Sequence, residues 1–283
     1  MSQPVSILGS EMQLLNSQQT GRQYRITISL PWGYEAQPGE SWPFNNIPEK
    51  WPVVYVLDGN WYSGLITDMI RPTALCGGIS DAIVVGIGYP ETGTPIEVFR
   101  QVFTRRDHDL TPIVDSETRQ IMEAGQKRPV PNGDAGNFLM FIQQELIPFI
   151  EKGYHADPTQ RILVGHSYGG LFGLYALFTV PDLFQKMILG SPTLSYGKRY
   201  LFQREEIFAT EGKTPETDLY LFVSAEEESA NDATFTDTMR FAAILEGRGY
   251  PHLMLVKKIF TDQNHCEVAA PGFQWGLKQV LKK

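Results

Sequence analysis

Hydrophobic and polar residues follow two different patterns in the first third of the chain. Residues 23–30 (QYRITISL) alternate between polar and apolar side chains, which predicts a half-buried strand, and residues 6–15 are a candidate for another. Residues 52–57 (PVVYVL) and 82–88 (AIVVGIG) are instead continuous apolar runs, which are typical of strands buried on both faces. A helix is predicted near 62–75, between the two runs. Strand, helix and strand in this order indicate a parallel sheet with right-handed crossovers.

Predicted helices and strands continue to alternate in the second half of the chain. In order, they are a helix at 137–152, a strand at 161–164 with a helix after it, a strand at 186–192, a candidate helix at 197–211, a strand at 218–224, a helix at 234–248 closed by Gly249, a strand at 252–260 and a helix at 272–281. The pattern predicts an α/β fold with a mostly parallel central sheet. Ligands bind such sheets outside the carboxyl ends of the strands, so each loop can be judged by the strand end that it leaves.

Two long connections interrupt this pattern. Residues 36–52 are rich in Pro, Gly and Asn and lead into the beginning of a strand, so we expect them at the edge opposite the chemistry, without a catalytic role. Residues 92–136 show little periodicity and leave the carboxyl end of the strand at 82–88. A connection of this length in a compact domain is usually functional. We expect it to form a lid or substrate loop over the site.

A strand, a tight turn and a helix follow one another at residues 161–179 (RILVGHSYGGLFGLYALFT). The turn holds Ser167 between Gly165 and Gly169, which is the G-x-S-x-G pattern of a nucleophile elbow. On so tight a turn the serine backbone is strained and its hydroxyl stands above the sheet edge, while the glycines omit side chains that would collide. The alternative, an ordinary buried strand and helix, does not explain the paired glycines. Ser167 is therefore the predicted nucleophile.

Two backbone N–H groups are candidates for an oxyanion hole. The amide of Tyr168 lies at the predicted helix N-terminus, where an unpaired N–H and the helix dipole can receive developing negative charge. In hydrolases of this architecture the second donor comes from the loop after an earlier strand, which here is the turn Asp58-Gly59-Asn60. Asn60 or Gly59 is the candidate. The alternative is a simple turn, since all three residue types favour turns.

A serine hydroxyl needs a base to take its proton, and that base is most often a histidine held by a carboxylate. The chain has five histidines, at positions 108, 155, 166, 252 and 265. In this fold the residues are expected in the order serine, acid, histidine, which excludes the three histidines before Ser167. His252 and His265 remain as candidates. His252 begins its strand, whereas His265 follows the carboxyl end of the same strand. We therefore predict His265 as the base, and we expect His166 to pack beside the turn.

The acid is expected in the loop after residues 218–224, where three glutamates stand in a row. Adjacent side chains alternate in direction, so one of the three is expected to face inward. Glu227 is our choice, with Glu226 and Glu228 as alternatives. A solvated acidic turn is the other interpretation, and the enzyme would then work with a Ser–His pair.

Two neighbouring arginines in the 92–136 segment are candidates for substrate binding. Arg105 and Arg106, with Asp107 beside them, could clamp an anionic or catecholate-like group, because a guanidinium suits bidentate contacts. The alternative is a surface cluster of charges that pair with one another.

The overall composition narrows the function further. A formal charge of −8 for 283 residues argues against nucleic acid and anionic membrane surfaces as partners. The sequence shows neither a signal peptide nor an apolar stretch long enough to span a bilayer. Its two cysteines, Cys76 and Cys266, make neither a disulfide framework nor a metal cluster. We expect a cytoplasmic protein that needs no metal or other cofactor.

Several stretches resemble the esterase D-like family of α/β-hydrolases, and within it the branch of serine hydrolases that includes enterobactin-type siderophore esterases. The matching stretches are YVLDGNWY, RRDHDLTP, GNFLMFIQQELIPFIEKGY, RILVGHSYGGLFGLYALF, GSPTLSYG and NHCEVAAPGFQWGL. The resemblance implies Ser167 as nucleophile, His265 as base, an oxyanion hole at the DGN turn and the Tyr168 amide, and a substrate pocket formed in part by residues 105–112. It covers nearly the whole chain, so we expect one α/β-hydrolase domain over residues 1–283. Two departures are Ser195, where relatives often carry an aromatic residue, and the missing glycine before the acid.

These residues together predict a metal-free serine esterase that acts through an acyl-enzyme on a small-molecule ester. A siderophore trilactone esterase, an acyltransferase and a thioesterase would use the same machinery. The alternative from another class is a binding module that has kept the fold and lost catalysis.

Overall fold

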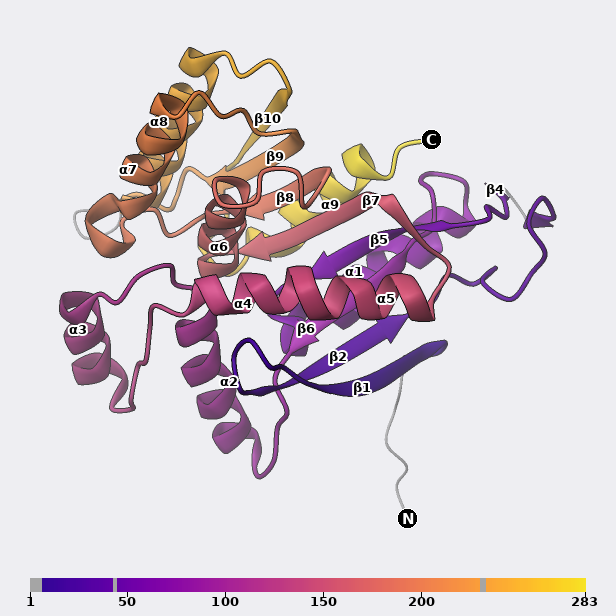
Figure 1. Cartoon of the computed structure of the whole chain (residues 1–283), viewed down its shortest axis with the longest axis horizontal. Coiled ribbons are helices and arrows are strands. Elements are labelled where there is room, and N and C mark those ends of the chain that lie inside the picture. Colours follow the sequence, from indigo (N-terminus) through magenta and orange to yellow (C-terminus); the bar gives the residue numbers. More distant parts are fainter. Residues whose placement is uncertain (1–6, 43–44, 230–232) are drawn as a thin grey trace.

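An eight-stranded sheet forms the centre of the computed structural model, which describes residues 7–42, 45–229 and 233–283. The strands are β1 (Ser10–Asn16), β2 (Gln23–Ser29), β5 (Trp51–Val56), β6 (Ile83–Gly88), β7 (Ala156–His166), β8 (Lys186–Gly190), β9 (Thr217–Ser224) and β10 (Leu253–Phe260). They lie in the order β1-β2-β6-β5-β7-β8-β9-β10. β5 to β10 run parallel, and β1 and β2 add antiparallel strands at one edge (Figure 1). The predicted, mostly parallel sheet is confirmed.

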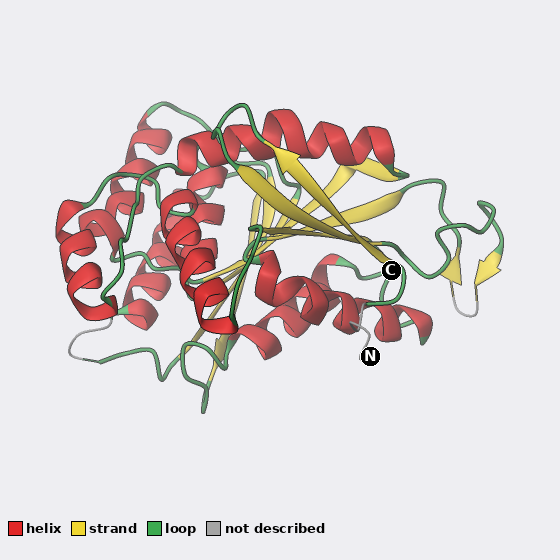
Figure 2. Ribbon diagram, turned by 90° about the horizontal axis from the view of Figure 1, so that it is seen from below, coloured by secondary structure: helices red, strands yellow, loops and turns green. Residues whose placement is uncertain are grey.

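Helices cover both faces of the sheet, as Figure 2 shows. One face carries α1 (Gly59–Leu75) and α9 (Ala269–Val280). The other face carries α4 (Ala135–Phe141), η1 (Ile142–Leu146), α5 (Ile147–Gly153), α6 (Tyr168–Leu177), α7 (Tyr196–Thr210) and α8 (Thr234–Arg248). Side chains alternate along a buried strand, so Val53 and Tyr55 of β5 join one core while Val54 and Val56 join the other. This explains the continuous apolar runs in the sequence.

The helix predicted at 137–152 is continuous but not uniform. The π-helical turn η1 lies between the α-helical segments α4 and α5. Pro148, near the start of α5, has no N–H to donate, and its ring would clash with the carbonyl of Gln144 in a regular α-helix. A wider turn just before the proline relieves that clash.

The two connections that interrupt the sequence pattern lie at opposite ends of the sheet. In its described residues the first contains the short strands β3 (Ser41–Trp42) and β4 (Asn45–Asn46). Figure 1 places it away from the carboxyl ends of the parallel strands, as predicted. The second, in which the sequence shows little periodicity, forms α2 (Pro95–Asp109) and α3 (Ser116–Gln126). Both helices lie near the carboxyl ends of the strands (Figure 1).

Helix α2 could not be predicted from the sequence because several of its charged residues are buried and several of its apolar residues are exposed. Its buried residues include Arg106, Asp107 and Asp109, whereas Ile96 and Phe99 are exposed. A hydrophobic periodicity search therefore finds no apolar face directed inward. The signal that was present is a capping box, in which Thr94 and Glu97 bond each other's backbone and Pro95 begins the helix.

The ends of the segment that carries α3 are joined at a narrow neck. The N–H of Gly133 donates to Oγ1 of Thr111 at 2.8 Å, and the N–H of Ala135 donates to the Thr111 carbonyl at 3.1 Å. The N–H of Asp134 donates to the His108 carbonyl at 3.0 Å. Beyond this neck, none of the described side chains of α3 is buried. Helix α3 itself is thus lightly packed, whereas the chain after it is anchored by buried Val130 and by the ion pair of Arg128 with Asp107 at 2.6 Å.

The remaining predicted elements are present with small shifts at their ends. The candidate strand at 6–15 is β1, although residue 6 lies outside the described residues. The candidate helix at 197–211 is α7, which contains a left-handed turn at residues 197–199. Among the helices of the described residues, none combines the length and the apolar character needed to cross a membrane.

Helix α9 lies unusually close to the sheet because two of its inward positions are glycines. A Cβ atom at Gly272 would collide with the ring of Phe222, and one at Gly276 would collide with the side chain of Ile188. Both partners belong to the buried core beneath α9. The absence of side chains at these positions therefore sets the distance between helix and sheet.

We predict that Gly276→Ala lowers the free energy of unfolding by about 1–3 kcal/mol, because the added methyl overpacks the core even though alanine favours a helix. Gly247→Ala in α8 is the matched control, since nothing lies within 4 Å of a Cβ atom there. The control should raise stability by up to about 1 kcal/mol. Urea unfolding measures both changes, and equal effects would contradict the packing argument.

Candidate active site

Ser167 stands between β7 and α6 in a strained backbone conformation. Its φ of 59° and ψ of −118° are values that side chains other than glycine rarely adopt. The surroundings impose them, since the N–H of Ser167 donates to the Gly190 carbonyl at 2.9 Å. A Cβ atom on Gly165 would stand 2.5 Å from the Gly169 carbonyl oxygen, so the turn requires a glycine at 165. This is the geometry that the G-x-S-x-G pattern predicted.

The second glycine of that pattern has a different explanation from the one we expected. A Cβ atom at Gly169 would make only ordinary contacts, the nearest at 3.5 Å from Oδ2 of Asp58. It is the next residue, Gly170, that has no room for a side chain. A Cβ atom there would lie 2.8 Å from the Gly190 carbonyl oxygen. Close approach of α6 to β8 therefore depends on Gly170, and the predicted steric role of Gly169 is wrong.

Of the three adjacent glutamates, Glu227 is the buried one, with 3% of its surface exposed. Its Oε1 accepts a hydrogen bond from Oγ of Ser191 at 2.6 Å and another from the N–H of Ser224 at 2.9 Å. Glu226 and Glu228 are exposed. Two neutral hydrogen-bond donors thus hold the carboxylate of Glu227 through Oε1 and leave Oε2 available for another partner.

The remaining oxygen of Glu227 faces His265. Its Oε2 lies 2.5 Å from Nδ1 of His265, whose N–H donates because the carboxylate can only accept. The proton on Nδ1 leaves Nε2 as the basic nitrogen. The side chain of His265 is 38% exposed and lines a cavity.

Ser167 and His265 line the same cavity, which has a volume of about 280 Å³. Its wall consists of Phe103, Arg106, Asp107, Met122, Gln126, Ser167, Tyr168, Thr193, Ser195, Thr234 and His265. Both α2 and α3 thus contribute to the wall, as expected of a segment over the site. Within the described residues Oγ of Ser167 contacts Oγ1 of Thr193 at 3.4 Å and makes no direct hydrogen bond with His265.

His166, next to the serine, packs in the interior as predicted. Its ring lies tilted against that of His265, with 4.7 Å between the centroids. It also stacks on the ring of Phe222 and meets that of Phe273 edge-on. Burial, followed by the charges of His265 and Arg106, lowers the pKa of His166 well below its usual value. His166 therefore stays neutral next to His265.

The turn after β5 lies next to the serine turn, because the N–H of Leu57 donates to the Val164 carbonyl at 3.0 Å. Gly59 is required for packing, since a Cβ atom there would stand 2.6 Å from the backbone of β6. The amide side chain of Asn60 bonds the backbone of Tyr89 in both directions, at 2.7 and 2.9 Å. Gly59 and Asn60 begin α1, as Tyr168 begins α6, so their N–H groups have no intrahelical acceptor.

The two candidate arginines are separated by the fold. Arg106 is buried in the cavity wall, where its Nε donates to Oδ1 of Asp58 at 2.7 Å and its guanidinium lies over the ring of Tyr168. Burial alone would lower the pKa of Arg106, but the charge of Asp58 raises it overall, so the guanidinium stays charged. Arg105 is absent from that wall and approaches the Gln23 carbonyl instead. The structure brings Arg106 to the site and not Arg105.

One group of potential metal ligands lies outside this cavity. Single atoms of His108, Asp109 and Asp134 come within 4.8 Å of one another. Arg22 already lies among them, with Nη2 at 2.5 Å from both carboxylates and Nη1 at 2.8 Å from Nδ1 of His108. The guanidinium supplies the positive charge that a cation would otherwise bring.

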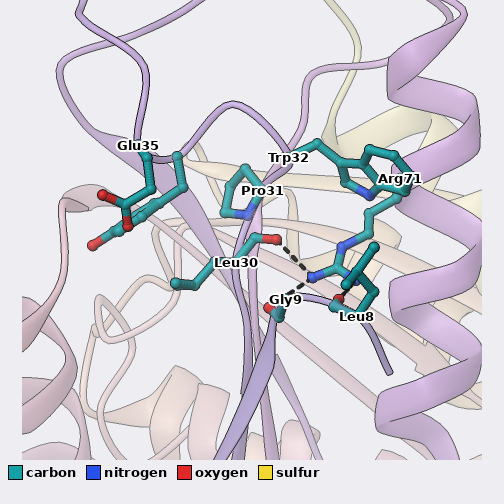
Figure 3. A pocket seen from close by; sticks show the side chains of 8 residues that line it. Leu8, Gly9, Leu30, Pro31, Trp32, Glu35 and Arg71 are labelled. Atoms are coloured by element: carbon teal, nitrogen blue, oxygen red, sulfur yellow. Dashed lines mark hydrogen bonds between the residues drawn. The ribbon is translucent and has the colours of Figure 1, made fainter. Parts of the chain in front are cut away.

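A second cavity of about 300 Å³ lies at the opposite edge of the sheet (Figure 3). The guanidinium of Arg71 reaches into it, but its donors are taken by the carbonyls of Leu8, Gly9 and Leu30. The lining is otherwise mainly apolar and includes Trp32. Among the described residues that line it, none pairs a nucleophile with a base.

Comparison with known proteins gives the family. The model of an esterase family, described as "Putative esterase", matches residues 17–234. The chain belongs to this esterase family. The ferri-bacillibactin esterase BesA of Bacillus subtilis is 31% identical over 278 residues, which cover 96% of this chain and 86% of BesA.

Solved structures agree with this assignment. A BES protein from Bacillus cereus has a TM-score of 0.81 at 27% identity and covers 100% of both chains. The siderophore hydrolase EstB from Aspergillus nidulans has a TM-score of 0.76 at 25% identity, covering 99% of this chain and 98% of EstB. The predicted α/β-hydrolase fold and the predicted hydrolysis of carboxylic esters are therefore confirmed.

Two residues of the esterase's site were missed from the sequence. Ser191 supports Glu227, and Thr193 contacts the hydroxyl of Ser167. Ser191 directly follows β8 and Thr193 lies three residues beyond it, at the carboxyl end of a parallel strand. That position was the available signal, since the same rule located His265.

The buried pair of Asp58 and Arg106 should be important for the stability of the esterase. We expect Arg106→Met to lower the free energy of unfolding by about 3–5 kcal/mol, because the charge on Asp58 would be left buried and unpaired. Adding Asp58→Asn should recover part of that loss. Urea unfolding of both single variants and the double variant measures the coupling.

Lys213→Met is the control for the buried pair. Lys213 and Glu211 form an ion pair with side chains 54% and 44% exposed. Such a pair contributes at most about 1 kcal/mol. If Arg106→Met were as mild as this control, the buried pair would not have the stabilising role assigned to it.

Proposed function

We propose that the esterase is a serine hydrolase that works through an acyl-enzyme, with Ser167 as nucleophile, His265 as base and Glu227 as the acid of a catalytic triad. The observation that carries the proposal is the 2.5 Å contact between Nδ1 of His265 and Oε2 of the buried Glu227, made by a histidine that shares a cavity with Ser167. The strained turn at Ser167 supports it, since such a turn is typical of a nucleophile elbow.

The reaction begins when Nε2 of His265 accepts the proton of the Ser167 hydroxyl, and Oγ attacks the ester carbonyl. To reach His265, the hydroxyl turns away from Thr193, and contacts of this kind often tighten only when substrate is bound. Glu227 stabilises the resulting imidazolium and keeps the ring oriented. The imidazolium then protonates the departing alcohol, and water repeats the steps to release the acid.

The tetrahedral intermediates need donors for their oxyanion. The N–H of Tyr168 at the start of α6 is the first donor, and the N–H of Asn60 or Gly59 at the start of α1 is the second. Each helix also places the positive end of its dipole there. One such donor lowers a barrier of this kind by about 3–4 kcal/mol.

For the substrate we propose a lactone ester of a siderophore. The supporting observations are the names of BesA, a ferri-bacillibactin esterase, and EstB, a siderophore hydrolase. Arg106 in the cavity wall is the proposed substrate-binding residue, while Arg105 has no contact in the structure that supports such a role. An acyltransferase or thioesterase would share the machinery, and product analysis with added alcohol or thiol separates these activities.

We place the enzyme in the cytoplasm as one hydrolase domain, with residues 92–136 as its lid. Cys76 and Cys266 are both unpaired and exposed, a state that suits a reducing compartment. The walls contributed by α2 and α3, together with the light packing of α3, support the role of the segment as a lid.

We expect Ser167→Ala and His265→Ala each to lower kcat/KM for ester hydrolysis by about 10⁴-fold or more, since the triad acts as a unit. Glu227→Gln should cost about 10²–10⁴-fold, because the histidine loses its orienting carboxylate. Hydrolysis of p-nitrophenyl esters measures the changes. His252→Ala is the control and should stay near the native rate, because His252 is exposed at the opposite edge.

Covalent labelling tests the nucleophile independently of turnover. A fluorophosphonate should add one adduct to the native protein, and peptide mass spectrometry should locate it on Ser167. Ser167→Ala should remain unlabelled under the same conditions. An adduct elsewhere, or none at all, would contradict the proposed nucleophile.

A further inference from the structure

Two serines with a strained backbone lie at the ends of neighbouring strands, at the edge of the sheet that carries the catalytic cavity. Ser167 follows β7 with a φ of 59°, and Ser191 follows β8 with a φ of 41°. The last residues of the two strands, His166 and Gly190, are paired in the sheet, so the two turns leave it side by side. A residue before a proline, as Ser191 is, favours an extended φ of about −120°. The conformation of Ser191 is therefore doubly unfavourable.

Hydrogen bonds on two sides hold Ser191 in this conformation. Its N–H donates to the Phe222 carbonyl of β9 at 2.8 Å. The carbonyl of the preceding residue, Gly190, accepts a hydrogen bond from the N–H of Ser167 at 2.9 Å. One peptide unit is thus bonded both to β9 and to the serine turn. A Cβ atom at Gly190 would collide with the ring of Phe222, so the chain can pass here only because residue 190 has no side chain.

This backbone directs the hydroxyl of Ser191 to the proposed catalytic acid. Ser191 is fully buried, and its Oγ donates to Oε1 of Glu227 at 2.6 Å. A hydrogen bond to an ionised carboxylate is stronger than one between neutral groups. With Oε1 held in this way, the carboxylate presents Oε2 to Nδ1 of His265 at 2.5 Å. The hydroxyl of Ser191 therefore orients the histidine through the carboxylate.

The same loop also contacts the proposed nucleophile. The N–H of Thr193 donates to the Ser167 carbonyl at 3.4 Å, and its Oγ1 lies 3.4 Å from Oγ of Ser167. We call residues 190–193 the β8 loop. Its two ends contact Ser167 and its middle contacts Glu227, so the loop sets the position of the nucleophile relative to the acid.

We propose that Ser191 is a positioning residue. The β8 loop holds it in a strained conformation so that its hydroxyl fixes the carboxylate of Glu227, and through it His265, relative to Ser167. The inference rests on the proposed function, since it assumes that these three residues form the catalytic triad. Glycine would adopt a positive φ without strain, but it has no hydroxyl. Position 191 is therefore one at which activity and stability oppose each other.

Two substitutions separate the hydroxyl of Ser191 from its backbone. Ser191→Ala and Ser191→Gly both remove the donor to Glu227, so each should lower kcat for p-nitrophenyl acetate by about tenfold and leave KM within about twofold. Only glycine tolerates the positive φ, so Ser191→Gly should unfold at a higher urea concentration than Ser191→Ala. Equal activities with unequal stabilities are the result expected of a positioning hydroxyl.

A double-mutant cycle shows whether Ser191 acts through the acid. In Glu227→Gln the carboxylate is already absent, so adding Ser191→Ala should lower kcat by less than about twofold. The same cycle with Ser191→Gly, which leaves the backbone unstrained, gives the answer even if Ser191→Ala fails to fold.

Ser29→Ala is the matched control for the loss of a buried hydroxyl. Ser29 is 1% exposed, and its Oγ bonds Oγ of Ser10 at 2.7 Å. It ends β2 and pairs with Val84 near the start of β6, so it lies at the amino ends of the parallel strands. Its substitution should leave kcat within about twofold.

Three outcomes would overturn the positioning role while leaving the esterase intact. The first is a native kcat in Ser191→Gly, because the hydroxyl would then be dispensable. The second is a tenfold loss that persists in the Glu227→Gln background, because Ser191 would then act independently of the acid. The third is a kcat that follows the urea midpoint from one variant to the other, which would indicate a structural role. Activity retained by Ser167→Ala, or a native rate in Glu227→Gln, would instead remove the proposed triad itself.

Discussion

The backbone of Ser167 is held in a conformation that it would not adopt by itself, and the rest of the site depends on this constraint. Strand β7 fixes one side of the turn, helix α6 fixes the other, and the hydrogen bond to Gly190 ties the turn to β8. Strain of this kind persists only where the surroundings determine it fully. The packed sheet beneath the turn therefore fixes the position of the proposed nucleophile.

Much of this arrangement could be predicted from the sequence because parallel strands all end at one edge. The continuous apolar runs located the strands, and the strand ends located Ser167 and His265, which are 98 positions apart in the chain. The alternation of side chains selected Glu227 from three glutamates, and it is the one that reaches His265. These inferences needed only the end of the strand at which a residue lies and the direction in which its side chain points. Neither requires knowledge of contacts between distant segments.

Contacts between distant segments could not be predicted in the same way. Helix α2 was missed because its buried side chains are charged and find partners such as Asp58 and Arg128, far away in the sequence. We expected Gly169 to prevent a steric clash, but the residue that does so is Gly170. The sequence does not show how close α6 lies to β8. The support that Ser191 gives to Glu227 was hidden for the same reason. Each miss concerns a partner that only the folded chain supplies.

The neck at Thr111 and Gly133 has a consequence for how this enzyme can diversify. The two residues are joined by a hydrogen bond of 2.8 Å, so the chain leaves the globule and returns to it at almost one point. Whatever is inserted between them hardly strains the scaffold, since loop closure depends on the ends and only weakly on the length. Helix α3, which buries no described side chain, is in this sense an exchangeable part of the excursion, while Arg128 after it stays paired with Asp107. Evolution can reshape the part of the cavity wall that α3 contributes by replacing this helix, while the proposed catalytic groups keep their places.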